Sequence, residues 1–128
     1  MIGGVGAFHV DVELVNPSRR LRTVKVAKLL VDTGREHTWI AEATLRGLGV
    51  SREKKDVPFL MANGQTITRQ VGFAIVRIAE RFTIDEVVFA LPDDLQLLGA
   101  RTLEGLNLTV DAARKRLVAA GPLPAAGT

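Results

Sequence analysis

The chain has 128 residues, of which 47% are hydrophobic and 24% charged, so it suits one compact domain and is neither disordered nor collagen-like. It has no cysteine, which excludes disulfides, thiolate zinc sites and cysteine nucleophiles. The net charge is only +3. No apolar run approaches the ~20 residues of a membrane span, and residues 1–6 lack the features of a secretory signal. A cytoplasmic protein with no membrane partner is therefore expected.

The first part of the chain predicts two strands and a short helix. Residues 8–15 alternate apolar and charged side chains, which is typical of a strand with one buried face. Residues 16–18 favour a turn, and residues 21–31 favour a second strand whose apolar end is buried on both faces. Residues 41–48 predict a short helix closed by Gly49, because glycine is a favourable left-handed cap.

A hairpin is expected in the middle of the chain. Residues 54–56 are charged and are interpreted as an exposed link. Asn63 and Gly64 then separate two extended segments, residues 57–62 and 65–71. Asn-Gly between such segments is a strong hairpin signal because both residues tolerate positive φ. The sequence therefore predicts a long hairpin with its tip at this dipeptide.

The rest of the chain predicts further short strands and a second helix. The strands are expected at residues 73–78, 82–91, 95–98, 108–110 and 116–118, and the helix at residues 100–106. The sum is one mostly β domain over residues 1–120, with about eight strands and two short helices. Residues 121–128 hold two prolines and several small residues, so they are expected to form a flexible tail.

Several kinds of catalytic or metal site find little support in the sequence. No serine lies in a Gly-x-Ser-x-Gly elbow, and the only histidines are His9 and His37. Neither has ligand partners at metal-binding spacing, so both are interpreted as ordinary hydrogen-bonded histidines, and no metal or cofactor is expected. The acidic pairs at residues 85–86 and 93–94 are interpreted as solvated, because adjacent strand residues point to opposite faces.

The motif Asp32-Thr33-Gly34 is the strongest candidate for chemistry. An apolar run leads directly into the carboxylate, and a second apolar-apolar-glycine segment at residues 97–99 precedes the second helix. With the hairpin around residues 63–64, these features give a sequence that resembles the retropepsin-like aspartic proteases. The resemblance runs from about residue 8 to residue 118, and its closing part is similar to prokaryotic single-domain members.

The resemblance implies an acid-protease β-barrel that hydrolyses peptide bonds as a homodimer. Aspartic proteases use two facing carboxylates that share one proton, because two like charges at that distance cannot both ionise cheaply. This chain has one suitable aspartate, Asp32, so a catalytic site needs a second copy related by a two-fold axis. In the family, the residue at Thr33 hydrogen-bonds across that axis, and Gly34 lets the backbone approach the carboxylates closely.

The resemblance also implies a set of substrate-binding residues. Leu98 would help to wall the cleft, and the hairpin tip with Ala62, Asn63 and Gly64 would fold down as a flap that excludes water. Arg35 departs from the family, which most often has alanine at this position. Its guanidinium could narrow a subsite, select an acidic substrate residue, pair with the adjacent glutamate or favour ionised dyad carboxylates.

Two alternatives come from other functional classes. Arg35 is the main support for a catalytically weak or inactive dimeric module that binds peptides or proteins with the same fold. A third interpretation is a nucleic-acid-binding β domain that uses the basic residues between 19 and 28. It is disfavoured because the chain has only six aromatic residues, five Phe and one Trp, and no recognition motif.

Overall fold

The computed structural model describes residues 8–125, which form a mostly β fold with two short helices. The residues considered for a secretory signal and the last three residues of the predicted tail lie outside this range. The elements are β1 (His9–Asn16), β2 (Arg19–Val31), β3 (Thr38–Ala41), α1 (Glu42–Leu48), β4 (Lys54–Leu60), β5 (Thr66–Ile78), β6 (Arg81–Ala90), β7 (Leu97–Leu98), α2 (Ala100–Gly105), β8 (Leu108–Asp111) and β9 (Arg116–Ala119).

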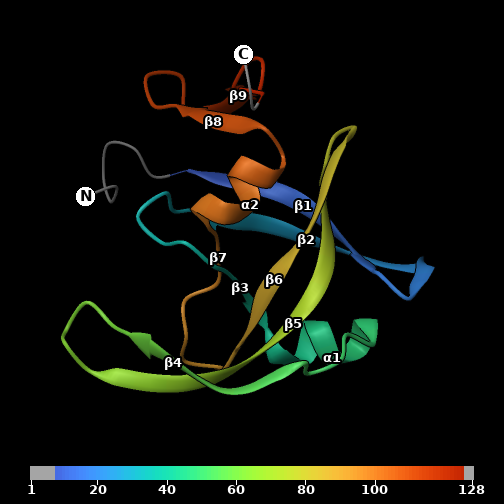
Figure 1. The fold of residues 1–128 in the computed structure, drawn as a ribbon, viewed down its shortest axis with the longest axis vertical. Helices are drawn as coiled ribbons and strands as arrows, with labels where there is room; N and C mark the ends of the chain where they lie inside the picture. The colour runs from blue at the N-terminus through green and yellow to red at the C-terminus, as the bar shows by residue number, and fades with distance from the viewer. Residues whose placement is uncertain (1–7, 126–128) are drawn as a thin grey trace.

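The main sheet closes on itself. Its strand order is β1-β2-β7-β3-β6-β5-β4, and β1 also pairs with β5, so six strands form a ring and β4 is attached to the outer edge of β5. The β4–β5 hairpin projects away from this ring, as the lower left of Figure 1 shows. Strands β8 and β9 form a separate hairpin at the opposite end.

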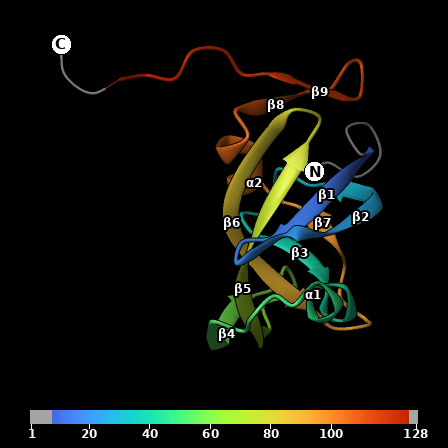
Figure 2. The ribbon, with the colours of Figure 1, turned by 90° about the vertical axis from the view of Figure 1, so that its right-hand side faces the viewer.

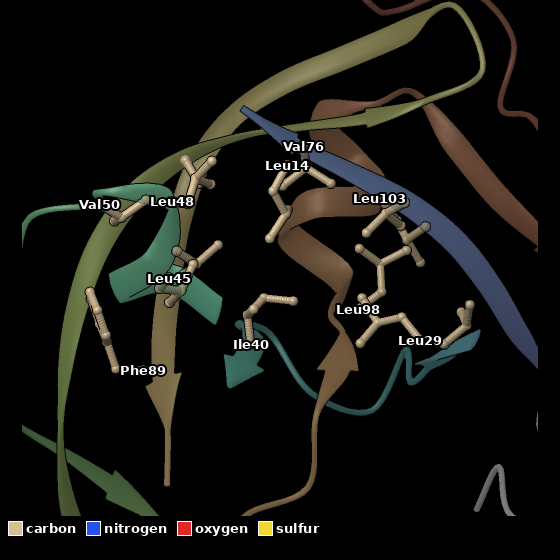
Figure 3. Packing of buried hydrophobic residues seen from close by; sticks show 14 of the residues in the cluster. Leu14, Leu29, Ile40, Leu45, Leu48, Val50, Val76, Phe89, Leu98 and Leu103 are labelled. Atoms are coloured by element: carbon tan, nitrogen blue, oxygen red, sulfur yellow. The ribbon is translucent and has the colours of Figure 1, made fainter. Parts of the chain in front are cut away.

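The ring encloses a core of aliphatic side chains. Leu14, Ile40, Leu45 and Leu98 are fully buried and come from β1, β3, α1 and β7. Figure 3 shows these side chains converging between the strands and the two helices. A second, smaller cluster around Trp39 lies toward the β4–β5 hairpin. Buried and exposed side chains alternate along the strands because one face of each strand packs into this core.

Most elements predicted from the sequence are present, and the differences have local causes. The described residues form nine strands, and one of them, the four-residue β3, was not predicted because it has no periodic pattern to detect. Residues 54–56 belong to β4 rather than to a link, although all three are exposed and the pairing of β4 with β5 shifts register there. The two segments predicted at residues 65–71 and 73–78 form one continuous strand, β5.

The predicted turn glycines lie where the backbone requires them. Gly49 ends α1 with φ of 84°, and its amide donates to the carbonyl of Arg46. At the hairpin tip, Gly64 has φ of 87° and its amide donates to the carbonyl of Met61. The predicted hairpin is present with its tip at Asn63 and Gly64, although only Gly64 uses the positive φ that both residues tolerate.

The described helices are short, and none is long and apolar enough to cross a membrane. After β9 the chain leaves the body of the domain, and its last described residues extend away from it (Figure 2).

Candidate functional site

The loop that follows β2 holds Asp32 in a fixed backbone position. Val31 pairs with Leu98 across the parallel β2 and β7 strands, and the amide of Asp32 donates to the carbonyl of Leu98 at 3.0 Å. The Asp32 side chain is 18% exposed, so the carboxylate is partly shielded yet open to solvent. The strand end and the two-residue strand β7 therefore present a carboxylate at the surface from a rigid base.

The two residues after Asp32 differ in how they relate to its carboxylate. The amide of Gly34 donates to Asp32 Oδ1 at 2.9 Å. A Cβ at position 34 would lie 3.2 Å from the same oxygen, tighter than most real contacts, so glycine suits this close approach. Thr33 is exposed at the surface of the single chain.

Arg35 lies beside the carboxylate rather than away from it. Its Nε is 3.9 Å from Asp32 Oδ2, and its side chain is 37% exposed. Within the described residues, Arg35 forms no ion pair with Glu36. Of the four roles considered for the guanidinium, pairing with the adjacent glutamate is therefore wrong, because the side chain turns toward Asp32.

The segment after β7 supports the loop through its backbone. The amide of Ala100 donates to the carbonyl of Arg35 at 2.7 Å, and the amide of Arg101 donates to the carbonyl of Glu36 at 3.0 Å. A Cβ on Gly99 would lie 2.6 Å from the carbonyl oxygen of Glu36 and closer still to that of His37. Only glycine allows the two segments to approach this closely.

Leu98 does not line a cleft in this structure. Its side chain is fully buried in the main core, where Figure 3 shows it between Ile40 and Leu29. The expectation that it walls the substrate cleft is wrong, because the strand pairing of β7 turns this side chain inward. Leu98 contributes to the site through its carbonyl, which holds the amide of Asp32.

A chain of hydrogen bonds runs beneath the loop. The amide of Gly99 donates to Thr38 Oγ1 at 3.0 Å, and Thr38 and Thr102 share a bond of 2.6 Å between their hydroxyl oxygens. The hydroxyl of Thr102 donates to Asp85 Oδ2 at 2.9 Å. Both threonines are fully buried, and Asp85 is not the solvated carboxylate that the sequence predicted, since it accepts the last bond of this chain.

A pocket of about 380 Å³ separates this loop from the β4–β5 hairpin. We call it the flap pocket; it is lined by residues 34–37, Trp39 and residues 57–62. Phe59 of β4 forms edge contacts with Trp39 and with His37, at ring-centroid distances of 5.2 and 5.4 Å. Figure 1 shows the loop after β2 and the hairpin tip on the same side of the molecule.

The predicted flap residues occupy different places around this pocket. Ala62 and Arg35 line it, whereas Asn63 and Gly64 are exposed at the tip and do not. A larger pocket of about 480 Å³ lies between the β1–β2 turn and the segment after α1, and it contains none of the predicted site residues. The flap pocket is therefore the cavity associated with Asp32.

An ion pair anchors the hairpin to the body of the domain. Arg69 of β5 donates from Nε and Nη2 to the two carboxylate oxygens of Asp94, at 2.6 and 2.8 Å. The hydrogen bond from Arg69, with further help from the Leu91 amide, lowers the pKa of Asp94 more than partial burial raises it. Asp94 is thus paired rather than solvated, which corrects the prediction for this residue.

His37, Trp39 and Phe59 were missed as site residues by sequence reasoning. His37 was interpreted as an ordinary hydrogen-bonded residue, and the aromatics appeared only as apolar members of short segments. The position of His37 and Trp39 five and seven residues after Asp32, and of Phe59 inside the hairpin, was the available signal. Their assembly around one pocket depends on the parallel pairing of β3 with β6, which no local pattern specifies.

Comparison with known proteins gives one result that bears on this geometry. A family model described as aspartyl protease matches residues 20–111, which include Asp32, the flap pocket and all of α2. A search of curated proteins finds no match for the chain. Among the described residues, no group of three or more acidic or histidine side chains could hold a metal ion.

Proposed function

The chain belongs to the aspartyl protease family, and on that basis we propose that it is a homodimeric aspartic endopeptidase in which Asp32 of two copies forms the catalytic dyad. The family match covers more than half of the 128 residues and supports a protease-like function. The chemistry needs two carboxylates, and the chain carries one Asp-Thr-Gly motif. A second copy related by a two-fold axis supplies the other.

The proposed reaction uses the two carboxylates as one acid and one base. The ionised carboxylate takes a proton from a water molecule, and the water oxygen attacks the carbonyl carbon of the scissile peptide bond. The protonated carboxylate gives a hydrogen bond and then its proton to the carbonyl oxygen, which produces a tetrahedral diol. The carboxyl group that took the proton from water then gives it to the amide nitrogen while the other carboxylate takes a proton from one diol hydroxyl. The C–N bond breaks, an amine and a carboxylic acid are released, and the dyad again holds one proton.

One observation carries this proposal: a partly exposed carboxylate is held rigidly in the loop that, together with the hairpin, lines a pocket. Asp32 is fixed by the carbonyl of Leu98 and by the amide of Gly34. Fixed donors and acceptors lower the cost of reorganisation during reaction, which is the main source of electrostatic catalysis. The adjacent flap pocket has room for a substrate side chain, and the hairpin above it can exclude water during hydrolysis.

Arg35 favours a second candidate function. Its guanidinium lies 3.9 Å from Asp32 Oδ2 at the mouth of the flap pocket. The guanidinium narrows the pocket and can bind an acidic group of a peptide there, which requires no chemistry at Asp32. A dimeric module that binds peptides in the flap pocket without cleaving them is therefore the alternative.

Cleavage of a peptide library by wild type and Asp32→Asn tests the two candidates. The assay covers roughly pH 4 to 7, where a carboxylate dyad shares one proton, at a protein concentration high enough to sustain a dimer. Asp93→Asn is the matched control, because Asp93 is exposed and lies outside the flap pocket. Analytical ultracentrifugation of the same samples reports the oligomeric state.

The proposal expects cleavage by wild type and Asp93→Asn, none by Asp32→Asn, and dimers in all three. A strict monomer that peptide does not convert to a dimer contradicts it. Dimers that bind peptides equally well with and without the Asp32 carboxylate, and never cleave them, establish the binding module instead.

A further inference from the structure

His37 lies between two charged groups of opposite sign at the edge of the flap pocket. Its Nε2 is 3.1 Å from Arg101 Nη1 and 3.6 Å from Glu86 Oε1. The imidazole also packs on Phe59 in a T-shaped arrangement at a centroid distance of 5.4 Å. His37 therefore connects a charged cluster with the hairpin wall of the pocket.

Glu86 is the centre of this cluster. Its Oε2 is 3.1 Å from Lys54 Nζ and 3.7 Å from Arg101 Nη2, and its side chain is 19% exposed. Partial burial alone raises the pKa of Glu86, but the hydrogen bond from Lys54 and the nearby positive charges hold it below the ordinary value. One ionised carboxylate thus joins β6, the start of β4, α2 and the loop after Asp32.

The protonation state of His37 decides which neighbour its Nε2 can bond. A neutral imidazole nitrogen without hydrogen accepts a bond from the guanidinium of Arg101. A protonated imidazole has hydrogen on both nitrogens, repels Arg101 and can donate only to the carboxylate of Glu86. The other charged groups around the ring are Lys54, which is paired with Glu86, and Arg35 and Glu36, which line the same pocket.

We propose that His37 and Glu86 are positioning residues that set the hairpin wall of the flap pocket, and that His37 exchanges Arg101 for Glu86 when it gains a proton. The exchange moves the imidazole against Phe59 and so changes how Phe59 packs on Trp39. Histidine side chains generally change charge between about pH 5 and 8, which overlaps the acidic range of the proposed reaction. The idea that this exchange tunes peptide cleavage rests on the proposed function.

Trp39 provides a readout of the wall that does not depend on cleavage. It is the only tryptophan in the chain, its side chain is nearly buried, and it contacts the edge of Phe59 at 5.2 Å. Emission and acrylamide quenching are measured from pH 5 to 8 for wild type and His37→Gln. His9→Gln is the matched control, since it removes the one other histidine, which is exposed on β1.

Wild type and His9→Gln are expected to show one transition in Trp39 quenching, and His37→Gln to show none. Glu86→Gln removes the acceptor for the protonated ring, so the transition in this variant is expected to move to lower pH. A flat wild-type curve overturns the inference, as does a transition that persists in His37→Gln. The wild-type curve keeps the test decisive where a variant fails to fold.

Kinetics separate a positioning role from a general effect on folding. Glu86→Gln is expected to raise KM by roughly fivefold with little change in kcat, because a shifted wall weakens substrate binding before the chemical step. Glu42→Gln is the control, since Glu42 forms an ion pair with Arg52 of similar length, 3.1 Å, away from the pocket. Equal kinetic effects of the two variants contradict the inference. If wild type cleaves nothing, the proposed function fails while the Trp39 titration still tests the wall.

Discussion

Replacement of Gly99 by alanine is the most direct test of how the site is supported. The added Cβ would lie 2.6 Å from the carbonyl oxygen of Glu36 and 2.6 Å from the carbonyl carbon of His37. It would lie nearer still to the carbonyl oxygen of His37. Real Cβ atoms essentially never approach other atoms within 3.0 Å. All three obstructing atoms belong to backbone, so no side-chain rotation can relieve the contact.

The size of the effect follows from this geometry. Overpacking a well-packed region usually costs about 1–3 kcal/mol, and a backbone obstruction places Gly99→Ala at the upper end, about 3 kcal/mol. Gly47→Ala is the matched control, because its Cβ meets nothing within 4 Å and the residue lies inside α1. Alanine there favours the helix by about 0.5–1 kcal/mol.

Urea unfolding at equal protein concentration measures both variants against wild type. With a slope of about 1.5 kcal/mol per molar urea, the midpoint falls by about 2 M for Gly99→Ala and rises by about 0.5 M for Gly47→Ala. Any cleavage activity should fall in Gly99→Ala even under conditions where it is folded, because the loop after Asp32 must move. A Gly99→Ala protein as stable as wild type would refute the reasoning that the two segments need this close approach.

Three further predictions concern the supports and the mouth of the pocket. Asp94→Asn breaks the paired contact with Arg69 and is expected to cost about 2 kcal/mol in urea unfolding. Because the pKa of Asp94 is lowered in the folded state, its contribution to stability is present above the unfolded-state pKa near 3.9 and is lost as pH falls through the folded-state value. The difference in unfolding free energy between wild type and Asp94→Asn should therefore shrink in acid. That difference would be constant if the pair did not form. Thr102→Val leaves Asp85 and Thr38 without a shared partner and is expected to lower the unfolding free energy by about 1–3 kcal/mol in urea unfolding. A loss no larger than that of a surface substitution would contradict the hydrogen-bond chain. Arg35→Ala opens the mouth of the flap pocket and should shift cleavage or binding in a peptide library toward larger side chains, so an unchanged preference would mean that Arg35 does not face the bound peptide.

Much of the fold could be predicted from the sequence because its signals are local. The alternation in β1, the glycine that ends α1 and the Asn-Gly tip of the hairpin each act within a few residues. Strand β3 could not be found in this way, because its first three residues are buried in succession, between its sheet neighbours β6 and β7, and show no alternation. A strand of this length has no period to detect.

The carboxylates show where local reasoning ends. Alternation correctly implies that Asp85 and Glu86 point to opposite faces of β6, but it does not say what lies on each face. Asp85 meets a buried hydroxyl 17 positions later in the chain, and Glu86 meets cations from β4 and α2. Asp94 is paired with a residue 25 positions earlier. These partners come from tertiary packing, so each carboxylate looked solvated from the sequence.

The segment at residues 97–99 shows that a motif can be located correctly and still be given the wrong role. Its resemblance to the family pointed to a wall of apolar side chains, but Leu98 is fully buried and reaches the site only through its carbonyl. The position that the site depends on is Gly99, whose missing side chain lets the backbone of α2 hold the carbonyls of residues 35 and 36. Substitutions of Leu98 should therefore act on stability, whereas Gly99→Ala should also displace the loop that carries Asp32.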